Sequence, residues 1–228
     1  DLVALIKRRV FDLAGCNSGV SVSFNGEPVP VRSFEDYVRL HLPVPAEGEQ
    51  APPVVFATVN DRWEIAVADS HAGQFVHSSF VNSIATTRGG THVSHVTDQV
   101  AKKVVEHVNK KNKDMQVNVP VVRNALSVFV NCRIVNPAFS SQTKEILTTT
   151  ASKFGSECNI PDRFLARVLS ELDIVENVTR SAKLRQAEEL MRKSSRVQTK
   201  ISGIPKLDDA NWAGGKRSAE CSLILTEG

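Results

Sequence analysis

The sequence lacks long apolar runs, clustered cysteines and a large net charge. No stretch approaches the roughly 18 consecutive apolar residues of a transmembrane helix, and the first residues do not resemble a signal peptide. We therefore expect no membrane partner. Cys16, Cys132, Cys158 and Cys221 are scattered without the close spacing of a zinc site, which is typical of reduced, buried thiols in an intracellular protein. A net charge of +3 does not by itself indicate nucleic-acid binding.

What is present is ordinary globular sequence. With 228 residues, 41% of them hydrophobic and 23% charged, the chain is long enough for one large or two small cores. It opens with an apolar helical stripe and no initiator methionine, so we interpret it as an internal fragment. That stripe consists of Leu2, Leu5, Ile6 and Leu13, and Gly15 is expected to end the helix as its C-cap.

The central part of the chain predicts a unit of strand, helix and strand. Residues 75–84 are rich in β-formers and stop before Gly89 and Gly90, which permit the positive φ angles of a tight turn. Four valines at every fourth position then indicate an amphipathic helix. They are Val96, Val100, Val104 and Val108. Residues 126–134 alternate between apolar and polar side chains, so this unit predicts parallel strands with a right-handed crossover.

The residues before this unit predict a hairpin, a helix and a boundary. Asn25-Gly26 lies between two β-like runs and is a strong signal for a two-residue type I′ turn. Ser33 is the expected N-cap of a short helix over residues 34–42. Prolines and a glycine interrupt residues 43–53, which predicts a surface loop and a domain boundary.

The remaining elements complete an α/β (α+β) fold. Residues 62–68 predict a strand that folds back on the next strand as the antiparallel edge of a mixed sheet. A helix follows Pro161, and residues 174–195 predict a long, exposed linking helix between partial flanking domains. Residues 223–225 predict a buried strand that places Glu227 at its end.

Three groups of polar residues are candidate sites. Residues 110–113 carry three lysines, which fit either DNA phosphates or a solvated helix end, and spacing alone favours the helix end. His92 and His95 lie one helical turn apart without a third ligand, so structural roles are favoured over a metal site. Residues 142–144 form a polar triplet that recurs at 198–200, and the triplet alone indicates little.

Four segments, in order along the chain, resemble eukaryotic DNA topoisomerase II. They are SFVNSIATTRGGTHV at 79–93, NPAFSSQTKE at 136–145, IPKLDDAN at 204–211 and LILTEG at 223–228. The resemblance covers essentially the whole chain and implies a mixed sheet of the transducer type. It implies that residues 1–53 end a GHKL ATPase domain, 54–173 form the transducer, 174–201 the linker helix and 202–228 the start of a TOPRIM domain.

The same resemblance implies roles for single residues. Lys144 is similar to the transducer lysine that reaches the γ-phosphate of ATP, with Gln142 and Thr143 beside it. A flexible ammonium on a loop is a movable point charge, so its phosphate contact can act as a switch that hydrolysis breaks.

Two further roles concern DNA. Lys110, Lys111 and Lys113 resemble the lysine-rich loop that lines the DNA passage, which raises the expectation of DNA contact above that of a solvated helix end. Glu227 resembles the TOPRIM glutamate, a catalytic residue that works beside Mg²⁺. The resemblance thus implies a fragment of a nuclear, homodimeric, ATP-dependent enzyme that passes one DNA duplex through a transient double-strand break in another. The fragment alone is expected to be inert.

The chain also departs from the usual pattern of that family. Ser94 and His95 replace Asp-Tyr, Ala125 and Ser127 replace His and Trp, and Trp212 stands where an acid is usual. Two alternatives stay open at this point. One is the middle domain of another GHKL ATPase, of the mismatch-repair or chaperone type, against which the TOPRIM-like end argues. The other is a plain βαβ module that binds nucleic acid.

Overall fold

The computed structural model describes residues 1–46, 48–111, 116–197, 208 and 210–225, with the backbone alone over 193–197. Contacts divide the chain into two units, Asp1–Arg180 and Ser181–Gly228. The elements in chain order are α1 (Leu2–Cys16), β1 (Ser23–Phe24), β2 (Glu27–Pro28), α2 (Phe34–Arg39), β3 (Val54–Asn60), β4 (Trp63–Asp69), β5 (Val76–Val81), β6 (Ile84–Ala85), α3 (Thr91–Lys111), α4 (Val119–Asn124), β7 (Leu126–Cys132), η1 (Ala151–Lys153), α5 (Asp162–Glu171), α6 (Ile174–Val197) and η2 (Ser218–Glu220). Within the described ranges, no helix is long and apolar enough to cross a membrane.

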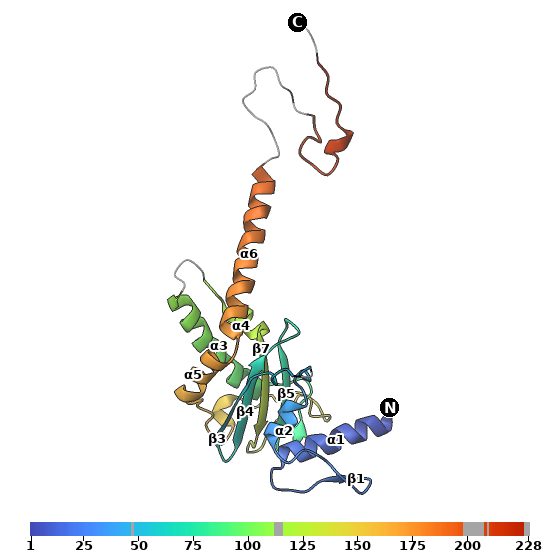
Figure 1. Ribbon diagram of the computed structural model, residues 1–228, viewed down its shortest axis with the longest axis vertical. Helices are drawn as coiled ribbons and strands as arrows, with labels where there is room; N and C mark the ends of the chain where they lie inside the picture. The colour runs from blue at the N-terminus through green and yellow to red at the C-terminus, as the bar shows by residue number, and fades with distance from the viewer. Residues whose placement is uncertain (47, 112–115, 198–207, 209, 226–228) are drawn as a thin grey trace. The chain divides into compact units, whose positions relative to one another are not determined.

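A mixed sheet forms the centre of the first unit, with strand order β3-β4-β7-β5-β6 (Figure 1). β5 and β7 pair in parallel, whereas the other neighbouring strands pair antiparallel. Because α3 lies between these parallel strands in the chain, the predicted βαβ crossover is confirmed, and its right hand stays a prediction. Each of the four valines in the α3 stripe is at most 1% exposed.

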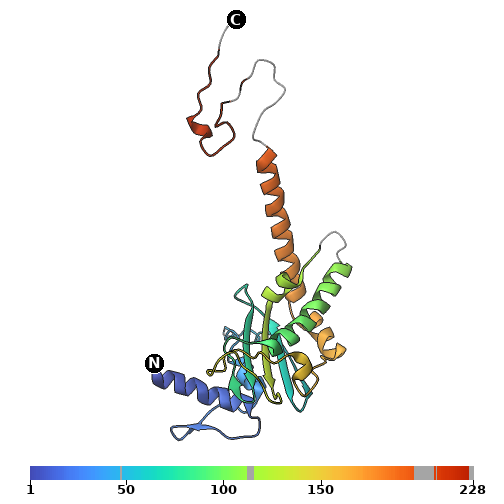
Figure 2. The same cartoon turned by 180° about the vertical axis from the view of Figure 1, so that it is seen from behind.

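Helices cover both faces of this sheet. Figures 1 and 2 show α3 on one face and α2, with the end of α1, on the other. On the α2 face, Phe34 and Tyr37 share one hydrophobic core with Ala66, Phe80 and Phe129 of the strands. The first part of the chain therefore shares its core with the sheet, and the domain boundaries expected from the sequence stay predictions.

The expected edge strand at residues 62–68 is a central strand, so that prediction is wrong. β4 pairs with β3 on one side and with β7 on the other, and it does not fold back directly on β5. Ala66 and Ala68 are as buried as Ile65 and Val67, because helices lie over both faces. The edge on this side of the sheet is β3, which is mostly half-buried and has too weak an alternation to be predicted.

The expected single strand over residues 75–84 is a strand followed by a tight hairpin. Asn82 and Ser83 take positive φ angles of 52° and 63° and turn β5 into β6. Asparagine tolerates this left-handed conformation better than most residues. Its side chain also accepts a bond from the Ile134 N–H at 2.9 Å and donates to the Ile134 carbonyl at 3.0 Å. These two bonds hold the turn against the end of the second parallel strand.

The first helix runs through Gly15, which is not its C-cap. A Cβ atom at Gly15 would lie 2.5 Å from the Tyr37 Cβ, so the glycine permits close packing of α1 on α2. The helix is also held by the Tyr37 hydroxyl, which donates to the buried Asp12 carboxylate at 2.8 Å. The four residues of the apolar stripe on α1 are between 47% and 70% exposed.

The next two predictions are confirmed in outline. Asn25 and Gly26, with φ of 53° and 86°, form the two-residue turn between β1 and β2. The Ser33 hydroxyl accepts a bond from the Asp36 N–H at 3.1 Å and so caps α2, which ends at Arg39, earlier than expected.

The C-terminal elements are partly as expected. α5 follows Pro161, and α6 confirms the long helix, which is buried at Ile174 and Val178 in its first turns. Residues 223–225 form no strand and are 79% to 86% exposed, so the prediction of a buried strand is wrong. An apolar tripeptide becomes a buried strand only where another strand pairs with it, and none does so within the described part of the chain. All four cysteines are free, and three of them are buried as expected, whereas Cys221 is only half-buried.

Candidate functional site

Residues 136–147, here called the lysine loop, form a short hairpin. Phe139 faces Leu147 across an antiparallel bridge. On one side of this pair the Ser140 N–H donates to the Ile146 carbonyl at 3.0 Å, and on the other the Thr148 N–H donates to the Ala138 carbonyl at 2.9 Å. The loop therefore has a defined backbone, which the sequence alone indicated only as a polar loop after a proline.

The tip of the lysine loop brings the predicted triplet together. The Lys144 N–H donates to the Ser141 carbonyl at 3.1 Å, which closes a tight turn with Gln142 and Thr143 at its exposed corner. Lys144 itself has a φ of 58°, in the left-handed region that favours glycine or asparagine. A lysine in this conformation costs about 1 kcal/mol, which is typical of strain held at functional sites.

The base of the lysine loop docks on the backbone at Gly90. The Leu147 N–H donates to the Gly89 carbonyl at 3.0 Å, and the Leu147 carbonyl accepts from the Thr91 N–H at 3.1 Å. A Cβ atom on Gly90, whose φ is 141°, would lie 2.4 Å from the Leu147 carbonyl oxygen. Because Thr91 is the first residue of α3, the loop also satisfies a free N–H at the start of that helix.

The two candidate histidines both make hydrogen bonds within the fold. The His92 Nε2 bonds the Thr86 hydroxyl at 3.1 Å, and its side chain is fully buried. Burial, with the nearby His77 as a smaller cause, lowers the pKa of His92 to about 3. The His95 ring bonds the Cys158 carbonyl at 3.1 Å. Within the described ranges, no group of three or more His, Cys, Asp or Glu residues is placed to hold a metal.

The candidate DNA-contacting lysines lie at the other end of α3. Lys110 and Lys111, here called the lysine pair, are both exposed in its last turn, and Lys113 lies outside the described residues. The pKa of the neighbouring His107 is lowered by loss of solvation and then by the charges of Lys111 and Lys110. At 1.5 Å per residue, α3 separates the lysine pair from the lysine loop by about 30 Å. The two candidate sites therefore lie at opposite ends of one helix.

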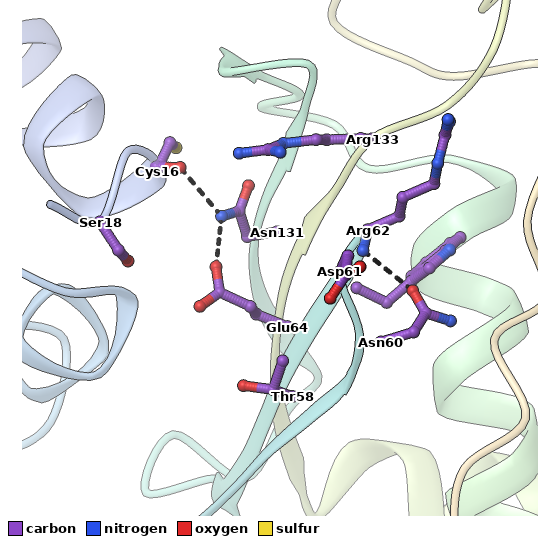
Figure 3. Close-up of a pocket in the computed structure, with 10 residues that line it drawn as sticks. Cys16, Ser18, Thr58, Asn60, Asp61, Arg62, Glu64, Asn131 and Arg133 are labelled. Carbon is purple, nitrogen blue, oxygen red and sulfur yellow. Dashed lines mark hydrogen bonds between the residues drawn. The ribbon is translucent and has the colours of Figure 1, made fainter. Parts of the chain in front are cut away.

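A cavity of about 150 Å³ lies between the end of α1 and strands β3, β4 and β7, and most of its lining residues are polar (Figure 3). At its wall the Asn131 amide donates to the Glu64 carboxylate at 2.7 Å and to the Cys16 carbonyl at 3.2 Å. These bonds tie the end of α1 to β4 and β7. The sequence did not predict this contact, because Asn131 stands at an ordinary polar position of the alternation in residues 126–134 and its partners lie far away in the chain.

The residues that depart from the family pattern have ordinary packing. The buried Ser127 hydroxyl donates to the Asp69 carbonyl at 3.2 Å, and the Ala125 carbonyl accepts from the Ser70 N–H at 2.9 Å. Trp212 is 46% exposed beneath the Arg217 guanidinium, 3.5 Å from the ring centroid. Glu227 lies outside the described residues, so the structure gives no geometry for it.

Comparisons of sequence and structure with known proteins all match DNA gyrase B or DNA topoisomerase II. The family model of DNA gyrase B matches residues 33–198. The chain is 49% identical to a probable DNA topoisomerase 2 of Dictyostelium discoideum, covering all of this chain and 15% of that protein. A crystal structure of the ATPase and transducer domains of DNA topoisomerase II from Balamuthia mandrillaris is 46% identical with a TM-score of 0.75, over 82% of this chain and 46% of that one. The ATPase region of topoisomerase II from Saccharomyces cerevisiae is 39% identical with a TM-score of 0.70, over 80% of this chain and 45% of that one.

Proposed function

This chain belongs to the family of type II DNA topoisomerases that includes DNA gyrase B, and we propose that it couples ATP binding to DNA movement within a longer, ATP-dependent enzyme. The chain spans 15% of the length of the Dictyostelium relative, so the strand-passing activity belongs to the longer protein. The family match favours this function over a mismatch-repair or chaperone ATPase and over a plain nucleic-acid-binding module. The domain divisions at 53, 173 and 201 are part of this proposal.

The observation that carries the proposal is Lys144 at the tip of an anchored loop. Its backbone conformation is strained, and among the described residues no carboxylate lies within 4 Å of its ammonium. A cation without a carboxylate partner, held at an exposed turn, fits a triphosphate, which would supply the negative charge and the bond to be hydrolysed. Lys144 would donate to the terminal phosphate, with Gln142 and Thr143 beside it at the same turn.

The other assignments complete the proposed enzyme. We assign the lysine pair and Lys113 to contacts with the phosphates of double-stranded DNA, since both described lysines are exposed. Glu227 is assigned by resemblance to DNA cleavage beside Mg²⁺. The longer protein is proposed to act as a homodimer in the nucleus.

The first experiment tests the function of the longer protein. Purified enzyme is expected to separate interlinked DNA circles when ATP and Mg²⁺ are present, and not when ATP is replaced by ADP. A Glu227→Gln variant serves as the control, because an amide can neither relay a proton nor bind the metal as a carboxylate does. Separation of circles without ATP, or none with it, would exclude the proposal.

A second experiment tests the lysine pair. Replacing Lys110 and Lys111 with alanine is expected to weaken duplex binding without sequence preference, because point charges at a helix end contact phosphates rather than base edges. The log-log salt dependence of affinity should flatten by as much as about 1.8, at about 0.9 per lost contact. The matched control replaces Lys102 and Lys153 with alanine, which removes the same charge from two exposed positions elsewhere. If the two double variants had the same salt dependence of DNA affinity, the lysine pair would be only a solvated helix end.

A further inference from the structure

The Lys144 ammonium has one partner among the described residues, and that partner is an aromatic ring. Its Nζ atom lies 6.0 Å from the centroid of the Phe139 ring. This is the outer limit for a cation-π contact, in which the negative face of the ring attracts the positive charge. Phe139 is half-buried.

The ring is held more firmly than the lysine. Phe139 faces Leu147, which is 1% exposed, and the two backbone bonds that flank this pair hold the strands of the hairpin together. Leu147 is in turn bonded on both its backbone groups to Gly89 and Thr91. The base of the hairpin is therefore fixed to the framework of the sheet and α3. The lysine stem, with four rotatable bonds, is the mobile part of the pair.

From this arrangement we propose that Phe139 is a positioning residue, which holds the Lys144 ammonium beside the loop tip before a phosphate arrives. An ammonium has three N–H donors, so the ring can face one side of it while phosphate oxygens accept from the other. The ring limits the positions that the free side chain samples. Fewer rotamers are then lost when the phosphate contact forms. The inference rests on the proposed function, since it assumes that Lys144 contacts ATP.

The test compares ring and volume at position 139 in the full-length enzyme. Phe139→Leu keeps an apolar side chain but removes the π face, and we expect kcat/KM for ATP to fall about two- to fivefold, the range of an exposed cation-π contact. Phe139→Tyr keeps the ring and should restore the wild-type value. A wild-type value for Phe139→Leu, or a Phe139→Tyr variant as slow as it, would overturn the inference.

A double-mutant cycle separates positioning from mere support of the hairpin. In a Lys144→Ala background, Phe139→Leu should cause no further loss of ATP hydrolysis, because there is no ammonium left to position. An equal loss in both backgrounds would show that Phe139 acts on the loop and not on the lysine. If Lys144→Ala alone leaves hydrolysis unchanged, the proposed function fails. If it slows hydrolysis while Phe139→Leu does not, only the inference fails.

Discussion

Replacing Lys144 with alanine in the full-length enzyme is expected to slow ATP hydrolysis about ten- to a hundredfold. The variant loses one hydrogen bond between charged groups, which is worth about 1.5–3 kcal/mol. Cleavage of DNA should be largely unchanged, because the lost contact is to ATP and not to the duplex. Steady-state ATP hydrolysis and plasmid cleavage, measured on the same preparation, check both halves of this expectation.

Lys144→Gly provides the matched control for stability. Glycine adopts the φ of 58° at this position without strain, whereas alanine keeps the strain that lysine bears. The free energy of unfolding of the glycine variant should therefore be about 1 kcal/mol higher than that of the alanine variant. Both variants should hydrolyse ATP equally slowly. If either variant hydrolysed ATP at the wild-type rate, the assignment of Lys144 to the ATP site would be wrong.

The second large effect is expected at Gly90, where the base of the lysine loop docks. Gly90→Ala should lower the free energy of unfolding by about 2–4 kcal/mol, from backbone strain and from lost bonds of the docked loop. The three atoms nearest the added methyl group are all backbone atoms of Leu147, which cannot move aside as the end of a flexible side chain could. Denaturant unfolding measures the loss of stability. ATP hydrolysis should also fall, because the undocked loop no longer presents Lys144 at a fixed place.

Gly73→Ala is the control for this variant. Gly73 also has a positive φ, of 64°, but nothing lies within 4 Å of a Cβ atom built there. It should cost only the conformational strain, about 1 kcal/mol, and leave ATP hydrolysis intact. If the two alanine variants were equally stable and equally active, docking of Leu147 on Gly90 would have no energetic weight.

Local patterns predicted the helices of this fold better than the order of its strands. The valine stripe of α3 depends only on a period within one segment, and it was confirmed by complete burial. The position of β4 depends on which strands lie beside it, and a buried central strand looks like an edge strand when its second face is built of alanines. Gly15 failed as a C-cap for a similar reason, since its partner Tyr37 belongs to another helix.

The candidate site shows the same limit. The residues at the tip of the lysine loop were identified by resemblance, and their turn follows from neighbouring residues. The sequence predicted only a tight turn at Gly90 and not the docking of the loop there, because the docking partner Leu147 comes much later in the chain. Phe139 was quoted only as part of a motif, since its relation to Lys144 depends on the hairpin that the bridge to Leu147 creates. A sequence pattern predicts such a contact only when the two residues that make it lie near each other in the chain.

The docking of Leu147 on Gly90 has a consequence for the order of folding. The two residues are separated in the chain by all of α3, α4 and β7, so their contact closes a long loop with a corresponding entropic cost. Pairing of β7 with β5 and packing of α3 on the sheet already bring the two residues close together, so little further loop entropy is lost when they make contact. The lysine loop should thus be among the last segments to order and the first to exchange its amide hydrogens, while the sheet below stays protected.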